Sequence, residues 1–131
     1  MTGGVMSLKK NNNAIAAFRK YARYGYDKVT VNIFDICNIA LGATSGKNEA
    51  AELVAVYQTL RALEYSGRAE TADAVRAVYF RYASRPLKKN EIAWRVRRFA
   101  VEGYMDERTV YRHLRVAKEL FERFYVDGIK K

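Results

Sequence analysis

Residues 106–115 read Asp-Glu-Arg-Thr-Val-Tyr-Arg-His-Leu-Arg, and this stretch decides the fold because it predicts a helix with two different faces. From here onward an apolar residue recurs every three or four positions, at Val110, Leu114, Ala117, Phe121 and Phe124. Asp106 stands where it can cap the free amides of the first turn, and Glu107 suits the positive end of the helix dipole. We therefore predict a helix over residues 106–126 with one buried side.

The face of this helix away from the apolar stripe is basic. Arginine donates two parallel hydrogen bonds from a planar group, which suits both guanine edges and phosphates. A helix that is buried on one side and arginine-rich on the other is typical of the recognition helix of a helix-turn-helix. The candidate DNA contacts on it are Arg108, Thr109, Tyr111, Arg112 and Arg115. The alternative is a solvated helix whose arginines pair with nearby glutamates.

A second helix is predicted over residues 87–102, after the break at Ser84-Arg85-Pro86. Its expected packing side consists of Ile92, Val96, Phe99 and Gly103. Basic residues crowd the rest of it, as suits a first helix that crosses the DNA backbone. The candidate DNA contacts are Lys88, Lys89, Arg95 and Arg98, with Arg97 beside them. Trp94 is expected to pack in the core, with a wedge between domains as the alternative.

Apolar spacing predicts further helices over residues 14–24, 48–65 and 69–83. In the first of these, Phe18 faces inward and Arg19 lies on the exposed side. In the second, the inward-facing residues are expected to be Leu53, Val56, Tyr57, Leu60 and Leu63. In the third, they are expected to be Ala72, Val75, Val78, Tyr79 and Tyr82.

Residues 29–41 fit two structures. β-Branched residues alternate at the start, as in a strand, whereas Asn32, Asp35 and Asn38 would form one polar stripe on a helix, which we favour. The chain is therefore predicted to be all-α, with about six helices and a C-terminal helix-turn-helix whose first helix is elongated. Residues 1–68 would form a helical scaffold or dimerisation part and residues 69–131 the DNA-binding part, within one compact domain.

Glu91-Ile92-Ala93, followed by Glu107 to Leu114 and Ala117, resembles the helix-turn-helix of region 4 in bacterial sigma factors. The resemblance covers about residues 75–125, and it is closer to the phage-encoded, sigma-like transcriptional regulators of the RinA and ArpU type. It implies a protein that activates late or packaging genes by binding promoter DNA. The 13 residues from Trp94 to Asp106 that separate the two motifs are more than the usual pattern has. The first helix is therefore expected to be about two turns longer.

The chain of 131 residues carries a net charge of +10, and most of the excess lies in its second half. Between Arg81 and Arg115 there are 10 basic and 4 acidic residues. A basic segment that coincides with the predicted helix-turn-helix fits a phosphate-binding surface, and the alternative is a solvated basic surface. The basic and aromatic cluster from Arg19 to Lys28 is a second candidate for nucleic-acid binding, although packing is the commoner role of such tyrosines.

The sequence gives little support to a catalytic or metal-dependent function. His113 and Cys37 are the only histidine and cysteine, too few for a zinc site of the usual spacing. Residues 42–47 superficially resemble a phosphate loop, but Asn48 stands where that motif needs serine or threonine. Three carboxylates could be imagined as a catalytic set, namely Asp35, Glu49 and Glu52. Their spacing, however, is what any solvated helix face offers. No enzymatic activity, cofactor or metal is expected.

These features predict a sequence-specific double-stranded DNA-binding protein, a phage or prophage transcriptional regulator that reads the major groove with helix 106–126. The alternative is a DNA-packaging protein similar to a small terminase subunit, or another helical assembly protein that binds DNA. RNA polymerase is considered as a further partner, and a homo-oligomer, preferably a dimer, is the expected assembly. Without an apolar span or a signal-peptide pattern, we expect no membrane partner and a location in the bacterial host cytoplasm.

Overall fold

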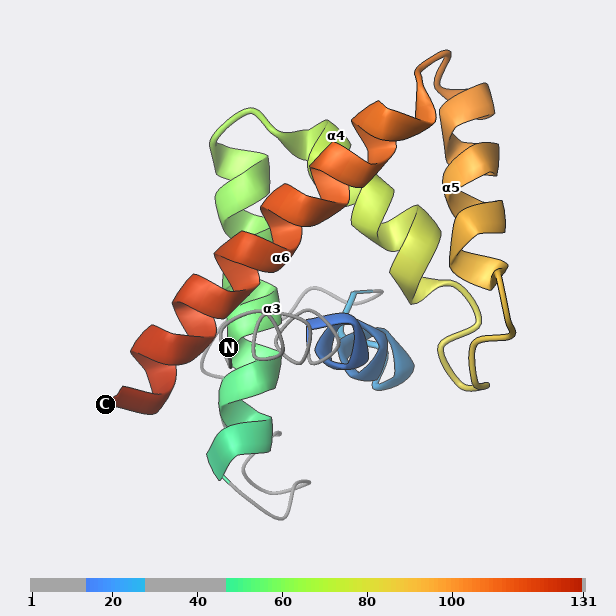
Figure 1. Cartoon of the computed structure of the whole chain (residues 1–131). Helices are drawn as coiled ribbons and strands as arrows, with labels where there is room; N and C mark the ends of the chain where they lie inside the picture. The colour runs from blue at the N-terminus through green and yellow to red at the C-terminus, as the bar shows by residue number, and fades with distance from the viewer. Residues whose placement is uncertain (1–13, 28–46, 131) are drawn as a thin grey trace, which may run out of the picture.

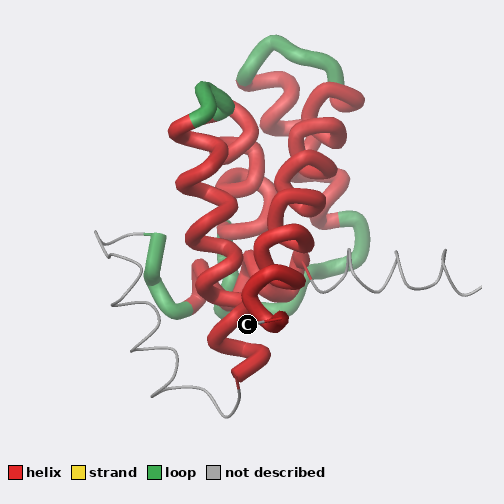
Figure 2. Tube along the Cα trace, turned by 90° about the vertical axis from the view of Figure 1, so that its left-hand side faces the viewer, coloured by secondary structure: helices red, strands yellow, loops and turns green. Residues whose placement is uncertain are grey.

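The computed structural model describes residues 14–27 and 47–130, and every regular element in these ranges is helical, as Figure 2 shows. Residues 14–23 are helical (segment 14–23), and a turn at residues 24–27 follows them. The later elements are α3 (Lys47–Tyr65), α4 (Ala69–Val75), the π-helical turn η1 (Arg76–Phe80), α5 (Glu91–Glu102) and α6 (Glu107–Lys130). The all-α class is thus confirmed for these residues. The helix predicted over 29–41 lies outside them, together with Asp35 and Cys37.

Three helix ends differ from the predicted positions by three or four residues. α4 passes without a break into η1, which ends at Phe80 because Arg81 is extended (φ −66°, ψ 136°) and Tyr82 is left-handed (φ 51°). α5 begins at Glu91 rather than at residue 87, after Asn90 in a left-handed conformation (φ 65°, ψ 8°). α6 continues past residue 126 to Lys130.

α6 is the helix around which the others are arranged. It runs diagonally across α3 and α4 in Figure 1 and packs against both. α5 lies beside η1 and the first turns of α6, to which the turn at residues 103–106 joins it. Segment 14–23 lies below α4 and η1 in the same view, and its apolar side chains enter the core that all these helices share.

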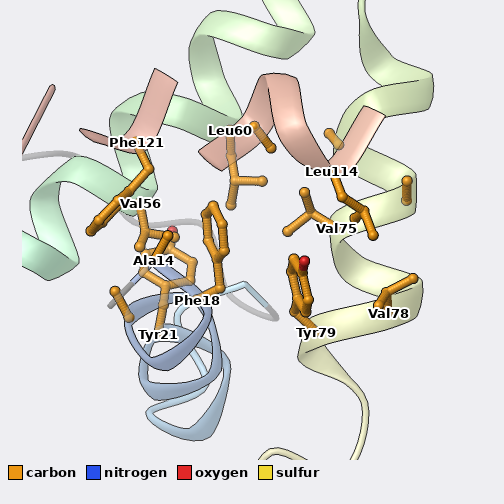
Figure 3. Close-up of a cluster of buried hydrophobic side chains, with 14 of the residues drawn as sticks. Ala14, Phe18, Tyr21, Val56, Leu60, Val75, Val78, Tyr79, Leu114 and Phe121 are labelled. Atoms are coloured by element: carbon orange, nitrogen blue, oxygen red, sulfur yellow. The ribbon is translucent and has the colours of Figure 1, made fainter. Parts of the chain in front are cut away.

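The core is centred on Phe18, whose ring is fully buried. This ring stacks on Tyr79 of η1, with ring centroids 5.8 Å apart, and tilts against Phe121 of α6 at 5.6 Å. Figure 3 shows the Phe18 ring among side chains of α3 and α4 that include Val56 and Val75. Many residues predicted to face inward are buried: Leu53, Val56, Leu60, Leu63, Ala72, Val75, Val78, Tyr79, Val110, Leu114, Ala117 and Phe121.

Arg19 is buried, so the prediction that it lies on the exposed side of its helix was wrong. Its guanidinium donates to four carbonyl oxygens at and beyond the end of η1, those of Tyr79 (3.2 Å), Arg81 (3.5 Å), Tyr82 (3.1 Å) and Arg85. The last carbonyls of a helix lack partners within that helix, and Arg19 supplies one to the buried Tyr79 carbonyl. Its burial lowers the pKa of the Arg19 guanidinium.

Two aromatic side chains that were expected in the core are exposed, Tyr82 to 66% and Trp94 to 70%. Tyr82 lies beyond the end of η1, where the guanidinium groups of Arg85 and Arg95 lie 5.1 and 6.0 Å from its ring centroid. Such cation–π contacts are compatible with an exposed ring. Trp94 lies on the side of α5 away from its buried residues, and Gly103, expected on the packing side, is exposed at the end of α5.

Candidate nucleic-acid interface

The first three turns of α6 present a basic face to solvent. Val110 and Leu114 are buried, which fixes the orientation of the helix. The exposed or partly exposed side chains opposite them are Arg108, Thr109, Tyr111, Arg112 and Arg115. Within residues 14–27 and 47–130, no carboxylate forms an ion pair with any of these three arginines. Their guanidinium groups are therefore open to a ligand, unlike those of a helix whose arginines pair with its own glutamates.

Asp106 fixes the beginning of α6, as the sequence predicts. Its Oδ1 accepts a hydrogen bond from the backbone N–H of Arg108 (3.1 Å), and its carbonyl oxygen accepts one from Thr109 (3.0 Å). These bonds satisfy amides that have no partner within the helix. The first turn of the basic face is thereby held in a defined position.

The turn between α5 and α6 is short and hydrogen-bonded. The backbone N–H of Gly103 donates to the Phe99 carbonyl (3.0 Å), and that of Met105 donates to the Ala100 carbonyl (2.9 Å). Tyr104, at its tip, has a left-handed backbone (φ 54°) and is 97% exposed. The two helices therefore meet at a defined turn rather than through a long loop.

Glu91, the first residue of α5, is the centre of a charged network that attaches α5 to η1. Its carboxylate accepts hydrogen bonds from Nη1 (3.0 Å) and Nη2 (2.8 Å) of Arg85 and from the backbone N–H of Lys88 (2.9 Å). It also accepts one from Arg95, whose other terminal nitrogen donates to the carbonyl of Val78 in η1 (2.8 Å). The base of α5 is thus tied to the preceding helix.

This network removes Arg95 from the candidate DNA contacts. The Arg95 side chain is only 9% exposed, and its guanidinium is engaged with Glu91 and the Val78 carbonyl. Arg95 was predicted to be exposed because arginine on a basic helix usually faces solvent. Its position on α5, however, faces η1. Lys88 and Lys89 are exposed in the turn before α5.

The two other arginines of α5 are exposed. The Nε atom of Arg98 lies 3.3 Å from Oε2 of Glu102. Arg97, which was not selected from the sequence, is 64% exposed and approaches Glu107 of α6, with 3.6 Å between Nε and Oε2. Arg97 therefore borders the basic face of α6 on the α5 side. The sequence signal for it was its place in the basic run, which did not distinguish it from its neighbours.

On the other side of α6, a pocket of about 260 Å³ separates this helix from the turn between α3 and α4. It is lined by Gly67, Arg68, Glu70, Thr71, Thr109, Arg112, His113 and Val116. His113 is held there by a hydrogen bond of 2.8 Å between its Nδ1 and Thr71 Oγ1. Arg68 was missed by the sequence analysis because no local pattern shows that this turn lies beside α6.

The basic and aromatic cluster from Arg19 to Lys28 is not a single exposed surface in its described part. Arg19 is buried, and so are the rings of Tyr21 and Tyr26. Lys20 Nζ lies 3.5 Å from Glu52 Oε1. Tyr21 and Tyr26 thus pack against the protein, which is the commoner of the two roles considered for these tyrosines, whereas Tyr24 is exposed.

The comparisons with known proteins indicate neither a family nor a function for the chain. No protein-family model matches the chain, and no curated protein and no solved structure is significantly similar to it. None of the described helices has the length and hydrophobicity that a bilayer crossing requires. In the described ranges, no three histidine, cysteine, aspartate or glutamate side chains gather so that they could hold a metal ion.

The contribution of Glu91 to the free energy of unfolding depends on pH. Hydrogen bonds from Arg85, and then those from the Lys88 amide and Arg95, lower the pKa of Glu91 to about 2. An unfolded chain protonates a glutamate near its ordinary pKa of about 4.3. The folded state therefore gains stability from the carboxylate above that pH and loses this gain as the pH falls towards 2.

We expect wild type to be more stable than Glu91→Gln at about pH 6, and the difference to shrink as the pH falls from about 4.5 to 2. Thermal unfolding followed by circular dichroism at a series of pH values measures this difference. Glu119→Gln, which changes an exposed carboxylate of α6, is the control and should not show the same convergence. A constant difference between wild type and Glu91→Gln across this pH range would contradict the network.

Proposed function

We propose that the chain binds double-stranded DNA in a sequence-specific manner and acts as a transcriptional regulator encoded by a phage or prophage. The observation that carries this proposal is the basic face of α6. Three arginines there are exposed and free of ion pairs among the described residues, on a helix that is anchored by its opposite side. The resemblance of residues 75–125 to sigma-like regulators supports the regulatory role.

The connection of α5 to α6 fits a helix-turn-helix in which α6 is the recognition helix. The major groove is about 12 Å wide and admits one α-helix, and the residues near the start of a recognition helix contact the base edges. Arg108 and Arg112 occupy that region of α6. α5 has 12 residues and is therefore about 18 Å long.

The surrounding charges also favour a polyanion. Arg97 lies beside the start of α6, and Lys88 and Lys89 are exposed before α5. Lysine and arginine side chains that neutralise phosphates release condensed counterions, which gives affinity for any duplex sequence. The arginines of α6 would then add preference for particular bases, because guanidinium groups pair with guanine edges.

The first test is duplex binding itself. We expect the affinity for a labelled DNA duplex to fall steeply when the salt concentration rises from about 50 to 200 mM, because each phosphate contact releases counterions. Fluorescence anisotropy at several salt concentrations measures the slope. If the chain binds no duplex even at the lowest salt concentration, the proposal is wrong.

The second test separates base recognition from phosphate attraction. Arg108→Ala and Arg112→Ala should relax the preference at one or two base pairs, each by about 1–3 kcal/mol. Lys88→Ala and Lys89→Ala should weaken all duplexes about equally and flatten the salt dependence. Competition against a randomised pool of duplexes, followed by sequencing of the bound fraction, distinguishes these two patterns.

A uniform loss of affinity in all four variants would favour the alternative proposal of a DNA-packaging or assembly protein without base recognition. Oligomeric mass, measured by sedimentation, then separates the two classes. A monomer or dimer fits a regulator, and a large ring fits a packaging subunit similar to a small terminase. The expected result is a dimer, whose two reading helices would contact half-sites about one helical turn apart.

A further inference from the structure

The pocket beside α6 contains groups suited to an anion. Arg68 and Arg112 are exposed and line the pocket, together with Thr109. Glu70 is the one carboxylate in the lining, so the two guanidinium groups outweigh it in charge. The volume of about 260 Å³ exceeds the share of one water molecule, about 30 Å³, several-fold. The pocket therefore has room for a group larger than water.

The position of the pocket relates it to the basic face. Thr109, Arg112, His113 and Val116 line it from α6, at spacings that form one stripe along that helix. Arg112 belongs both to this stripe and to the exposed face. The pocket thus lies on one flank of the basic face, whereas Arg97 of α5 borders the other flank.

A helix in the major groove has a phosphodiester backbone along each of its flanks. Cations on both flanks, contributed by elements other than the helix itself, therefore match the charge of the two groove walls. Arg97, which also approaches Glu107, supplies such a cation from α5. On the opposite flank, the exposed Arg68, in the turn between α3 and α4, lines the pocket beside the stripe.

We propose that the pocket lined by Arg68, Thr109 and Arg112 binds a phosphodiester group of the DNA backbone. Arg68 provides the charge and Thr109 a hydroxyl donor, and Arg112 remains the contact that also reaches towards the bases. This inference rests on the proposed DNA-binding function. It extends the interface to a turn that the sequence analysis assigned to the scaffold part of the chain.

The test compares Arg68→Ala with wild type by duplex titration in the full chain at several salt concentrations. The variant should bind all duplex sequences about 3- to 10-fold more weakly, and its salt slope should be smaller in magnitude by about 0.9, the value for one phosphate contact. Arg68→Lys should retain most of the slope because it keeps the charge. Arg123→Ala, which removes an exposed arginine near the other end of α6, is the matched control and should leave the slope unchanged.

A second measurement locates the contact directly. Addition of duplex should shift the amide NMR signals of Gly67 and Arg68 in wild type, and Arg68→Ala should lose the shift at Gly67. If wild type binds duplex but Arg68→Ala keeps the same affinity and slope, the phosphate site is wrong and the DNA-binding function stands. If wild type binds no duplex, the function itself is wrong, and this inference with it. Unchanged thermal unfolding of the variant shows that any loss of affinity comes from the surface.

Discussion

Phe18→Ala should lower the free energy of unfolding by about 3–5 kcal/mol, the usual cost of removing a buried phenylalanine side chain. Its ring is fully buried and contacts Tyr79 and Phe121, so the deletion leaves a cavity where segment 14–23, η1 and α6 meet. Whole domains are stabilised by only about 5–15 kcal/mol, which makes this loss a large fraction of the total. Urea denaturation followed by far-UV circular dichroism measures it.

The same experiment shows whether segment 14–23 and residues 69–130 form one folding unit. Loss of Phe18 should shift a single transition, because the core is shared by both parts. Phe18→Leu, which retains most of the apolar volume, should cost less than about 1.5 kcal/mol. Tyr104→Ala changes a fully solvated ring and serves as the control. A Phe18→Ala transition that coincides with that of wild type would rule out this core.

Arg19→Met should cost about 1.5–3 kcal/mol, the range for hydrogen bonds to a charged group. Methionine retains the apolar stem and removes the guanidinium that reaches the end of η1. The Tyr79 carbonyl would then be buried without this partner, whereas the carbonyls beyond η1 lie closer to solvent and can accept water. Denaturation with urea again gives the difference.

Arg23→Met is the control for Arg19→Met, because Arg23 is exposed one turn further along the same helix. Arg19→Lys should fall between wild type and methionine, since one ammonium group keeps the charge but reaches fewer carbonyls. Equal stability of Arg19→Met and wild type would mean that water or other groups satisfy these carbonyls. The arginine would then have no structural role.

The helices could be predicted because their signal is local. The apolar stripe from Val110 to Phe121 requires only the spacing of one segment, and the burial of these residues confirms it. The capping position of Asp106 was equally local, and its side chain makes the expected hydrogen bond. The exposed arginines of α6 followed from the same stripe, because a helix with one buried side must expose the other.

The residues that were predicted incorrectly depend on distant partners or on where a helix ends. Arg19 is buried against carbonyls that lie about 60 residues further along the chain. No local pattern in the sequence shows these partners. Tyr82 has helical spacing but follows the end of η1, where a left-handed backbone changes the direction of its side chain. Trp94 was assigned to the core by residue type, although the periodicity of α5 places it opposite Val96. Periodicity is the better guide where the two disagree.

The exposure of Trp94 determines what fluorescence can report in this protein. It is the only tryptophan of the chain, and its indole is largely solvated in the folded state. Its emission should therefore lie near that of a free indole and change little on unfolding, so intrinsic fluorescence is a poor probe of stability here. The same solvation makes Trp94 a sensitive reporter on the surface of α5, because any molecule that covers this helix must exclude water from the indole.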